Sequence, residues 1–162
     1  MHYIVANVAK AWANWFPYRK VAELGSYEIN GNLIGIFDNS VGFDVVPGPR
    51  VDVIIKPGVI PEEHKGQYDT VIAISSFQFC PDSNLFLNQI EQLLIPGGKF
   101  LVTLCTPECA GGHRISIDHY DDCLRPTKPQ LLEIFNRFEH VIVYETVPEY
   151  HKDFVVIGRK KL

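Results

Sequence analysis

An acid, a glycine and a serine stand close together near the start of the chain, at Glu23, Gly25 and Ser26. They belong to the stretch KVAELGSYEINGN (20–32), which leaves an apolar run, passes through small residues and reaches a second glycine, Gly31. Glycine lets the backbone approach a bound molecule closely, and the first turn after a strand of an open α/β sheet is a common ligand site. The stretch is therefore either a ligand-binding turn or an ordinary strand-to-helix junction.

A second acid, Asp44, stands 21 positions after Glu23, near the end of the next apolar run. A carboxylate at this place can accept hydrogen bonds from both hydroxyls of a ribose. The two acids together predict a nucleoside-like ligand that lies across the tips of the first two strands. The alternative is that Asp44 merely solvates the end of a strand.

The segment GGHRISIDHYDDC (111–123) gathers titratable side chains after the fifth apolar run. We predict that it is a loop and that it supplies a general base, because loops at this edge often carry function and histidine titrates near neutral pH. A solvated polar loop is the alternative. Asp122 and Arg125 form a DxxR pattern that fits a structural ion pair as well as a contact with substrate. The candidate bases are His113, Asp118 and His119.

The four cysteines predict reduced thiols, because they are too few for a disulfide framework in a chain that can build its own core. Cys105, Cys109 and Cys123, together with His113 and His119, offer zinc-compatible atoms. No CxxC pair is present, and buried reduced cysteine is a common core residue. The sequence therefore predicts no metal site.

Most of seven short apolar runs are rich in Val and Ile, which is typical of strands buried on both faces of a sheet. Helical patterns separate most of them, which indicates an α/β sheet with mostly parallel strands. The last two runs are joined only by PEYHKD, which suits an antiparallel hairpin. The predicted strands are 20–25, 40–46, 51–56, 68–75, 99–105, 140–147 and 154–160, and the predicted helices are 9–16, 30–37, 83–94 and 128–138.

Helix 83–94 has apolar side chains at steps of three and four residues, so one face should cover the sheet. Asp82 or Ser83 can cap its start, and the proline and two glycines of IPGGK (95–99) predict a turn into the next strand. In the first helix, Trp12 is expected to pack against the domain, with a lid over a ligand as the alternative.

Composition predicts one globular domain, 1–162, whose first 19 residues are a helical segment with a possible covering role. The chain has 162 residues, of which 46% are hydrophobic and 21% are charged, with a net charge of −4. This balance gives no broad attraction for a phosphate backbone, so nucleic acid is disfavoured as a partner. The opening residues lack the pattern of a secretory leader, and no apolar run reaches membrane-spanning length, which predicts a cytoplasmic protein without a membrane partner.

The order of these motifs resembles the class I S-adenosylmethionine-dependent methyltransferases. VAELGSYEINGN followed by GFDVVPGPRVDV is similar to a small group of that family in which an NG pair follows a GSY motif. The likeness continues through YDTVIAISSFQF, LNQIEQLLIPGGKFLVTLCTP and DHYDDCLRPTKPQLLEIF, and covers about 21–138. It implies a Rossmann-like, three-layer α/β/α fold with about seven strands and a C-terminal antiparallel hairpin.

The resemblance also implies that the chain binds S-adenosylmethionine and releases S-adenosylhomocysteine. Glu23 would approach the methionine end of the cofactor, and Asp44 would hold the ribose with Val45 beside the adenine. Lys56, Pro57, Gly58 and Val59 stand where many relatives have an adenine-binding aspartate, so backbone bonds and apolar stacking would serve there. The implied cofactor-binding residues are Glu23, Gly25, Ser26, Tyr27, Gly31, Asp44, Val45, Gly58, Val59, Ser75 and Ser76.

The expected activity is methyl transfer to a small molecule or to a glycan-type or natural-product-type acceptor. SSFQ (75–78) replaces the motif of base-amine nucleic-acid methyltransferases, which disfavours that class. The alternative is a non-catalytic relative that binds the cofactor or its product, or serves as an interaction module, because an acid and a histidine common after Ser76 are replaced. A dinucleotide oxidoreductase is a more distant third, because GSYEINGN lacks the GxGxxG spacing.

Overall fold

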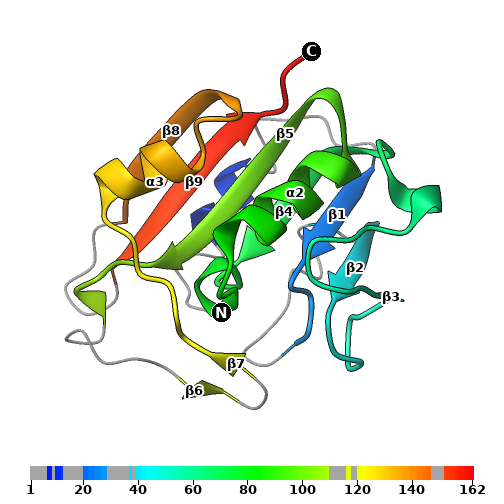
Figure 1. The fold of residues 1–162 in the computed structure, drawn as a ribbon, viewed down its shortest axis with the longest axis horizontal. Helices are drawn as coiled ribbons and strands as arrows, with labels where there is room; N and C mark the ends of the chain where they lie inside the picture. Colours follow the sequence, from blue (N-terminus) through cyan, green and yellow to red (C-terminus); the bar gives the residue numbers. More distant parts are fainter. Residues whose placement is uncertain are drawn as a thin grey trace.

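The computed structural model is built on one seven-stranded sheet (Figure 1). It describes residues 7–8, 10–12, 20–28, 37, 39–109, 116–117, 120–146 and 152–162. Strands β1 to β5 pair in parallel, whereas β9 is antiparallel to both β5 and β8. The strand order is β3-β2-β1-β4-β5-β9-β8. The strands are β1 Val21–Leu24, β2 Ser40–Asp44, β3 Val53–Ile54, β4 Tyr68–Ile74, β5 Leu94–Cys105, β8 Glu139–Glu145 and β9 Asp153–Arg159.

This arrangement confirms the predicted Rossmann-like α/β fold, including the antiparallel strand pair near the C-terminus. Parallel neighbours place their carboxyl ends at the same edge of the sheet, so residues that follow β1, β2 and β4 meet there. The sequence motifs at Glu23, Asp44 and Ser75 all lie at or just beyond these ends.

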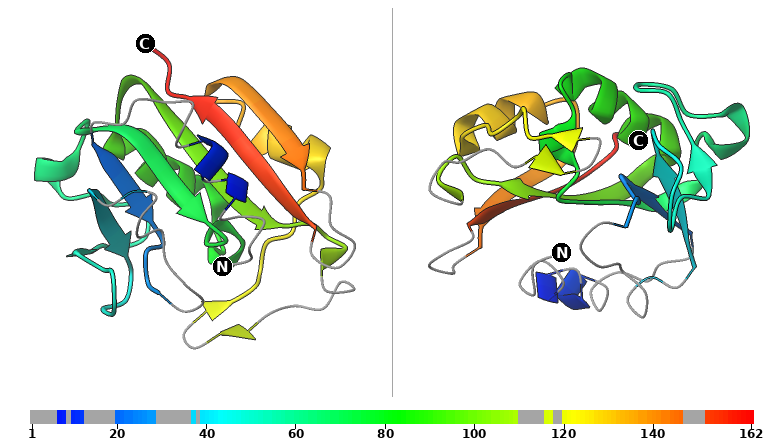
Figure 2. Two further views of the ribbon diagram at one scale, coloured as in Figure 1. Left: turned by 180° about the vertical axis from the view of Figure 1, so that it is seen from behind. Right: turned by 90° about the horizontal axis from the view of Figure 1, so that it is seen from below.

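Helices α2 (Ser83–Leu93) and α3 (Lys128–Ile134) cover one face of the sheet, and the helical residues near the N-terminus lie on the other (Figure 2). The larger apolar cluster includes Ile90 of α2 and Leu131 of α3, both fully buried. A smaller cluster on other sheet side chains is contacted by Trp12. Trp12 therefore packs against the domain, as expected, because its ring buries apolar area on the sheet.

Helix α2 begins where the sequence predicted, because Asp82 accepts a hydrogen bond from the Asn84 backbone N–H as an N-cap. Its end differs from the prediction. The helix stops at Leu93 and β5 starts at once at Leu94, which pairs with Tyr68. The expected turn at 94–99 is instead an irregular start of the strand, because a register shift between Tyr68 and Thr70 accommodates it.

The segment expected to be a loop contains a short hairpin. β6 (Ser116–Ile117) and β7 (Tyr120–Asp121) pair antiparallel in a separate two-stranded sheet. Strands of two residues carry too little alternation to be seen in a sequence. The prediction of a plain loop was wrong at these four residues. The predicted helix at 30–37, apart from position 37, lies outside the described residues.

Among the described residues, no helix combines the length and apolar character needed to cross a lipid bilayer.

Candidate functional site

The first turn of the site follows β1 and is held tightly to neighbouring strands. Gly25 has φ of +77°, and its N–H donates to the Phe43 carbonyl at 2.8 Å. A β-carbon added at Gly25 would lie 2.3 Å from Cβ of Ser76, which follows β4. Glycine is therefore required here both by the left-handed backbone and by the close approach of β4. The Ser76 hydroxyl donates to the Leu24 carbonyl at 3.0 Å and ties the two strand ends together.

Asp44, the last residue of β2, is 5% exposed, and its carboxylate faces this turn. Oδ2 accepts the Tyr27 N–H at 3.0 Å, while Oδ1 accepts the Val45 N–H at 2.6 Å and the Val46 N–H at 3.4 Å. Asp44 thus presents two buried acceptor oxygens, held by backbone N–H groups, at the carboxyl end of β2.

An aromatic group covers the Asp44 carboxylate. The Tyr120 phenol, from β7, donates a hydrogen bond to Oδ1 of Asp44. The Tyr120 ring centroid lies 6.3 Å from that of Tyr27 and 5.9 Å from that of Phe79. A β-carbon on Gly48 would lie 2.0 Å from the Tyr27 ring, so the loop after β2 supports Tyr27 from the other side. The sequence placed Tyr120 in a candidate functional segment but did not predict this contact.

Glu23 supplies a second buried carboxyl at this edge. It is 7% exposed, and its pKa is raised to about 7, because burial opposes ionisation more strongly than the nearby Arg50 guanidinium favours it. Arg50 Nη2 lies 3.8 Å from Glu23 Oε2. Among the described residues, neither Glu23 Oε2 nor the buried hydroxyl of Ser26 has a hydrogen-bond partner. Orphaned buried polar atoms are uncommon and point to a missing partner.

Ser75 has the backbone conformation that marks many functional turns. Its φ is +50°, and its N–H donates to the Thr103 carbonyl at 3.0 Å and to the Thr103 hydroxyl at 2.9 Å. These bonds hold the residue in a sparsely populated region that costs about 1–3 kcal/mol for a non-glycine residue. The next residue, Ser76, stands beside Gly25 at the junction of β1 and β4.

The predicted adenine-side residues occupy two different places. Val45 directly follows Asp44 and its side chain is exposed, as is that of Val59. Gly58 lies in a turn that contacts α2: its carbonyl accepts a bond from Gln92 at 2.9 Å, and an added β-carbon would lie 2.7 Å from Leu85. Val45 is thus adjacent to the Asp44 site, while the turn at 58–59 is anchored to the helix layer.

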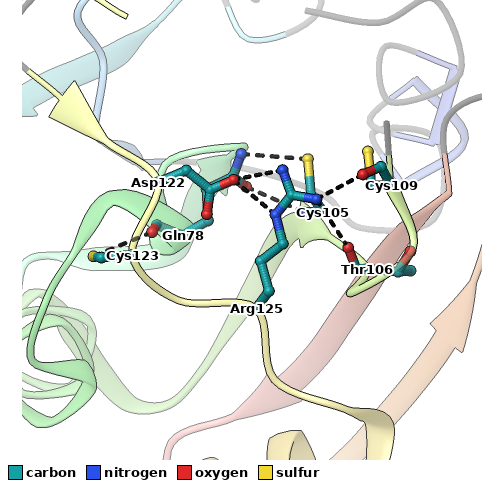
Figure 3. A network of polar contacts seen from close by, with 7 residues as sticks. All are labelled: Gln78, Cys105, Thr106, Cys109, Asp122, Cys123 and Arg125. Carbon is teal, nitrogen blue, oxygen red and sulfur yellow. Dashed lines mark hydrogen bonds and ion pairs between the residues drawn. The ribbon is translucent and has the colours of Figure 1, made fainter. Parts of the chain in front are cut away.

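A buried polar network fastens the chain between β7 and α3 to the end of β5 (Figure 3). Arg125 Nη2 lies 2.5 Å from Asp122 Oδ2, with side chains 3% and 0% exposed. Arg125 Nη1 donates to the carbonyls of Cys109 at 2.7 Å and Thr106 at 3.4 Å. The DxxR pattern therefore forms a buried ion pair that positions this chain segment.

Two thiols and a carboxyl lie close together beside this network. One ligand atom from each of Cys105, Cys109 and Asp153 lies within 4.8 Å of the others, and all three residues are buried. The pKa of the Cys105 thiol is raised, chiefly by burial and then by a hydrogen bond with Cys109. The Gln78 side-chain amide donates a hydrogen bond to Cys105 Sγ at 3.4 Å, so a neutral side chain contacts this sulfur. A protonated Cys105 fits the predicted reduced core cysteine.

Several predicted residues cannot be placed. The candidate bases His113, Asp118 and His119 lie outside the described residues, and so does Gly31. Arg50, by contrast, was missed by sequence reasoning and lies against Glu23. The only sequence signal for Arg50 was its place in the loop between the predicted second and third strands.

Comparisons with known proteins identify the fold. No protein-family model matches the chain, and no curated protein matches it. The structure is similar to the 1,6-didemethyltoxoflavin-N1-methyltransferase of Burkholderia thailandensis, solved with bound 1,6-didemethyltoxoflavin and S-adenosylhomocysteine. That match has a TM-score of 0.68 at 19% identity and covers 98% of this chain and 79% of the other. The fold is that of S-adenosylmethionine-dependent methyltransferases.

Two further methyltransferase structures have the same architecture. An S-adenosylmethionine-dependent methyltransferase from Methanosarcina mazei matches with a TM-score of 0.67 at 12% identity, covering 94% of this chain and 97% of the other. Phosphoethanolamine N-methyltransferase 2 of Haemonchus contortus, solved with S-adenosyl-L-methionine, matches with a TM-score of 0.69 at 14% identity. That match covers 96% of this chain and 53% of the other, so this chain spans about half the length of that protein.

Proposed function

We propose that this protein is an S-adenosylmethionine-dependent methyltransferase that acts on a small molecule or on a glycan-type or natural-product-type acceptor. The observation that carries the proposal is the Asp44 carboxylate, buried at the carboxyl end of β2 and bonded to three backbone N–H groups. A fixed acceptor at this point of an open α/β sheet suits the hydroxyls of a ribose. The solved structures of this fold that contain S-adenosylhomocysteine or S-adenosylmethionine support the choice of cofactor.

The other side chains at this edge fit the remaining parts of that cofactor. Glu23 Oε2 and the Ser26 hydroxyl are buried polar atoms without a hydrogen-bond partner among the described residues, as expected where a polar ligand completes them. In this proposal, Glu23 faces the cationic methionine end of the cofactor and Val45 lies beside the adenine. Gly25 has no side chain and lets the cofactor approach the backbone of the turn. Ser75 and Ser76 line the same junction between β1 and β4.

S-adenosylmethionine would supply an already activated methyl group, so the protein's task is mainly to orient the acceptor. Where the acceptor is a hydroxyl or carboxyl group, a base must accept its proton. We propose that this base is His113, Asp118 or His119. The net charge of −4 supports an acceptor other than nucleic acid.

Calorimetric titration with S-adenosylmethionine and S-adenosylhomocysteine, with NAD as a negative control, tests the proposal. Replacement Asp44→Asn should weaken S-adenosylhomocysteine binding by about tenfold or more, because it removes the charge from the hydrogen bonds to the ribose. Asp82→Asn makes the same change at the exposed cap of α2 and should leave affinity unaltered. Equal affinity of wild-type protein and Asp44→Asn would refute the ribose role.

A non-catalytic protein that binds the cofactor or its product, or serves as an interaction module, is the second candidate. The contact between Tyr120 and Asp44 favours it, because the proposed ribose acceptor is already engaged by the protein itself. Transfer of radiolabelled methyl groups to a panel of small hydroxyl, amine and carboxyl acceptors separates the two. Cofactor binding without transfer to any of them would support the second candidate.

A further inference from the structure

Among the described residues, four groups donate hydrogen bonds to the Asp44 carboxylate, and the Tyr120 hydroxyl is unlike the other three. Tyr27, Val45 and Val46 donate backbone N–H groups from the turn that follows β1 and from the two residues directly after β2. The phenol comes from a residue 76 positions away and bonds Oδ1, the oxygen already engaged by Val45 and Val46. A carboxylate has about four lone-pair positions, two on each oxygen. With Tyr120 in place, Oδ1 already has three donors for its two lone pairs, so a ribose hydroxyl could bond this oxygen only in place of the phenol.

A phenol and a ribose hydroxyl present the same group to this carboxylate, a neutral O–H donor. Burial, followed by the hydrogen bond to Asp44, raises the pKa of Tyr120, so the phenol keeps its proton at neutral pH. The ring also supplies a flat apolar surface between Tyr27 and Phe79. Tyr120 thus combines a hydroxyl donor with an aromatic plane, the two features that a nucleoside would bring to Asp44.

Tyr120 is carried by an element that can move without breaking the main sheet. The β6–β7 hairpin forms its own two-stranded sheet and lies beyond the edge of the seven-stranded one (Figure 1). Just after β7 the chain is fixed again. Cys123 and Leu124 donate backbone N–H groups to the Gln78 carbonyl at 2.9 and 3.0 Å, and Asp122 pairs with Arg125. A hinge between Asp121 and Asp122 would let Tyr120 leave Asp44 together with the rest of β7 and its partner strand β6.

We propose that Tyr120 is a latch on the nucleoside site: its hydroxyl occupies the ribose position on Asp44 and must leave before a nucleoside cofactor binds. This inference rests on the proposed function, because it names the regulation of the same site. The apparent affinity for the ligand is then the intrinsic affinity multiplied by the fraction of molecules in which Tyr120 is released. A protein that is mostly latched therefore binds its cofactor weakly until something stabilises the released hairpin.

The test is Tyr120→Phe, which keeps the ring and its packing and removes only the donor. Its dissociation constant for S-adenosylhomocysteine should fall about tenfold relative to wild type, because opening no longer breaks a hydrogen bond to a charged group. In stopped-flow experiments, the observed binding rate of wild type should rise with ligand concentration to a plateau. The plateau should be higher in the variant. Tyr144→Phe, on β8, is the matched control and should change neither quantity.

The outcomes separate the latch from the function on which it rests. Wild-type binding that Tyr120→Phe leaves unchanged or weakens would overturn the latch and leave the proposed cofactor in place. Absence of S-adenosylhomocysteine binding in wild type, Tyr120→Phe and the fully unlatched Tyr120→Ala would overturn both. A circular dichroism spectrum and a cooperative urea transition confirm that each variant is folded before these titrations are interpreted.

Discussion

The buried carboxyl of Glu23 makes the stability of the protein depend on pH in a defined window. Its pKa rises from 4.5 to about 7 on folding, because burial disfavours the charged form more than Arg50 favours it. The folded protein therefore binds more protons than the unfolded chain between these two values. The contribution of Glu23 to the free energy of unfolding is therefore most favourable below pH 4.5, and it falls as pH rises from 4.5 to about 7.

The size of the effect follows from the same two values. A pKa raised from 4.5 to about 7 corresponds to a loss of about 3 kcal/mol once both states are ionised, and most of it is lost between pH 5 and pH 8. Glu23→Gln has nearly the same shape and cannot ionise. The difference in unfolding free energy between the variant and wild type should therefore grow in favour of the variant by about 2–3 kcal/mol from pH 5 to pH 8.

Urea unfolding at pH 5, 6, 7 and 8 measures this difference directly. Subtracting the variant from wild type at each pH cancels the contributions of all other titrating groups. Glu63→Gln removes an exposed carboxyl near the short helix η1 (Glu62–His64) and should follow the wild-type profile. Parallel profiles for wild type and Glu23→Gln would show that Glu23 ionises normally in the folded state, and the reasoning from burial would be refuted.

Two further changes test the packing around the site. Asp122→Asn leaves the buried Arg125 guanidinium without its counter-charge and should lower the free energy of unfolding by about 3 kcal/mol or more, measured in urea; a change below 1 kcal/mol would mean that the pair is solvated. Gly25→Ala should cost more than about 2 kcal/mol, because φ is positive and the new methyl meets Ser76. Adding Ser76→Gly should recover part of this loss in thermal unfolding, and no recovery would contradict the predicted overlap.

The order of apolar runs and helical patterns determined the architecture. Runs rich in Val and Ile form β4, β8 and β9, and the short PEYHKD connection predicted the antiparallel pair of β8 and β9. These features are visible in sequence because they depend on local periodicity and on connection length. The start of β5 and the β6–β7 hairpin were not visible, because strand pairing with distant residues decides them.

The same division applies to the candidate site. Glu23 and Asp44 could be placed at one edge of the sheet from the sequence, because both stand at the ends of predicted strands. Only the tertiary structure brought Arg50 to Glu23 and Tyr120 to Asp44. A carboxylate's place along a strand follows from periodicity, whereas its burial, its pKa and the group that occupies its lone pairs depend on which distant side chains pack against it.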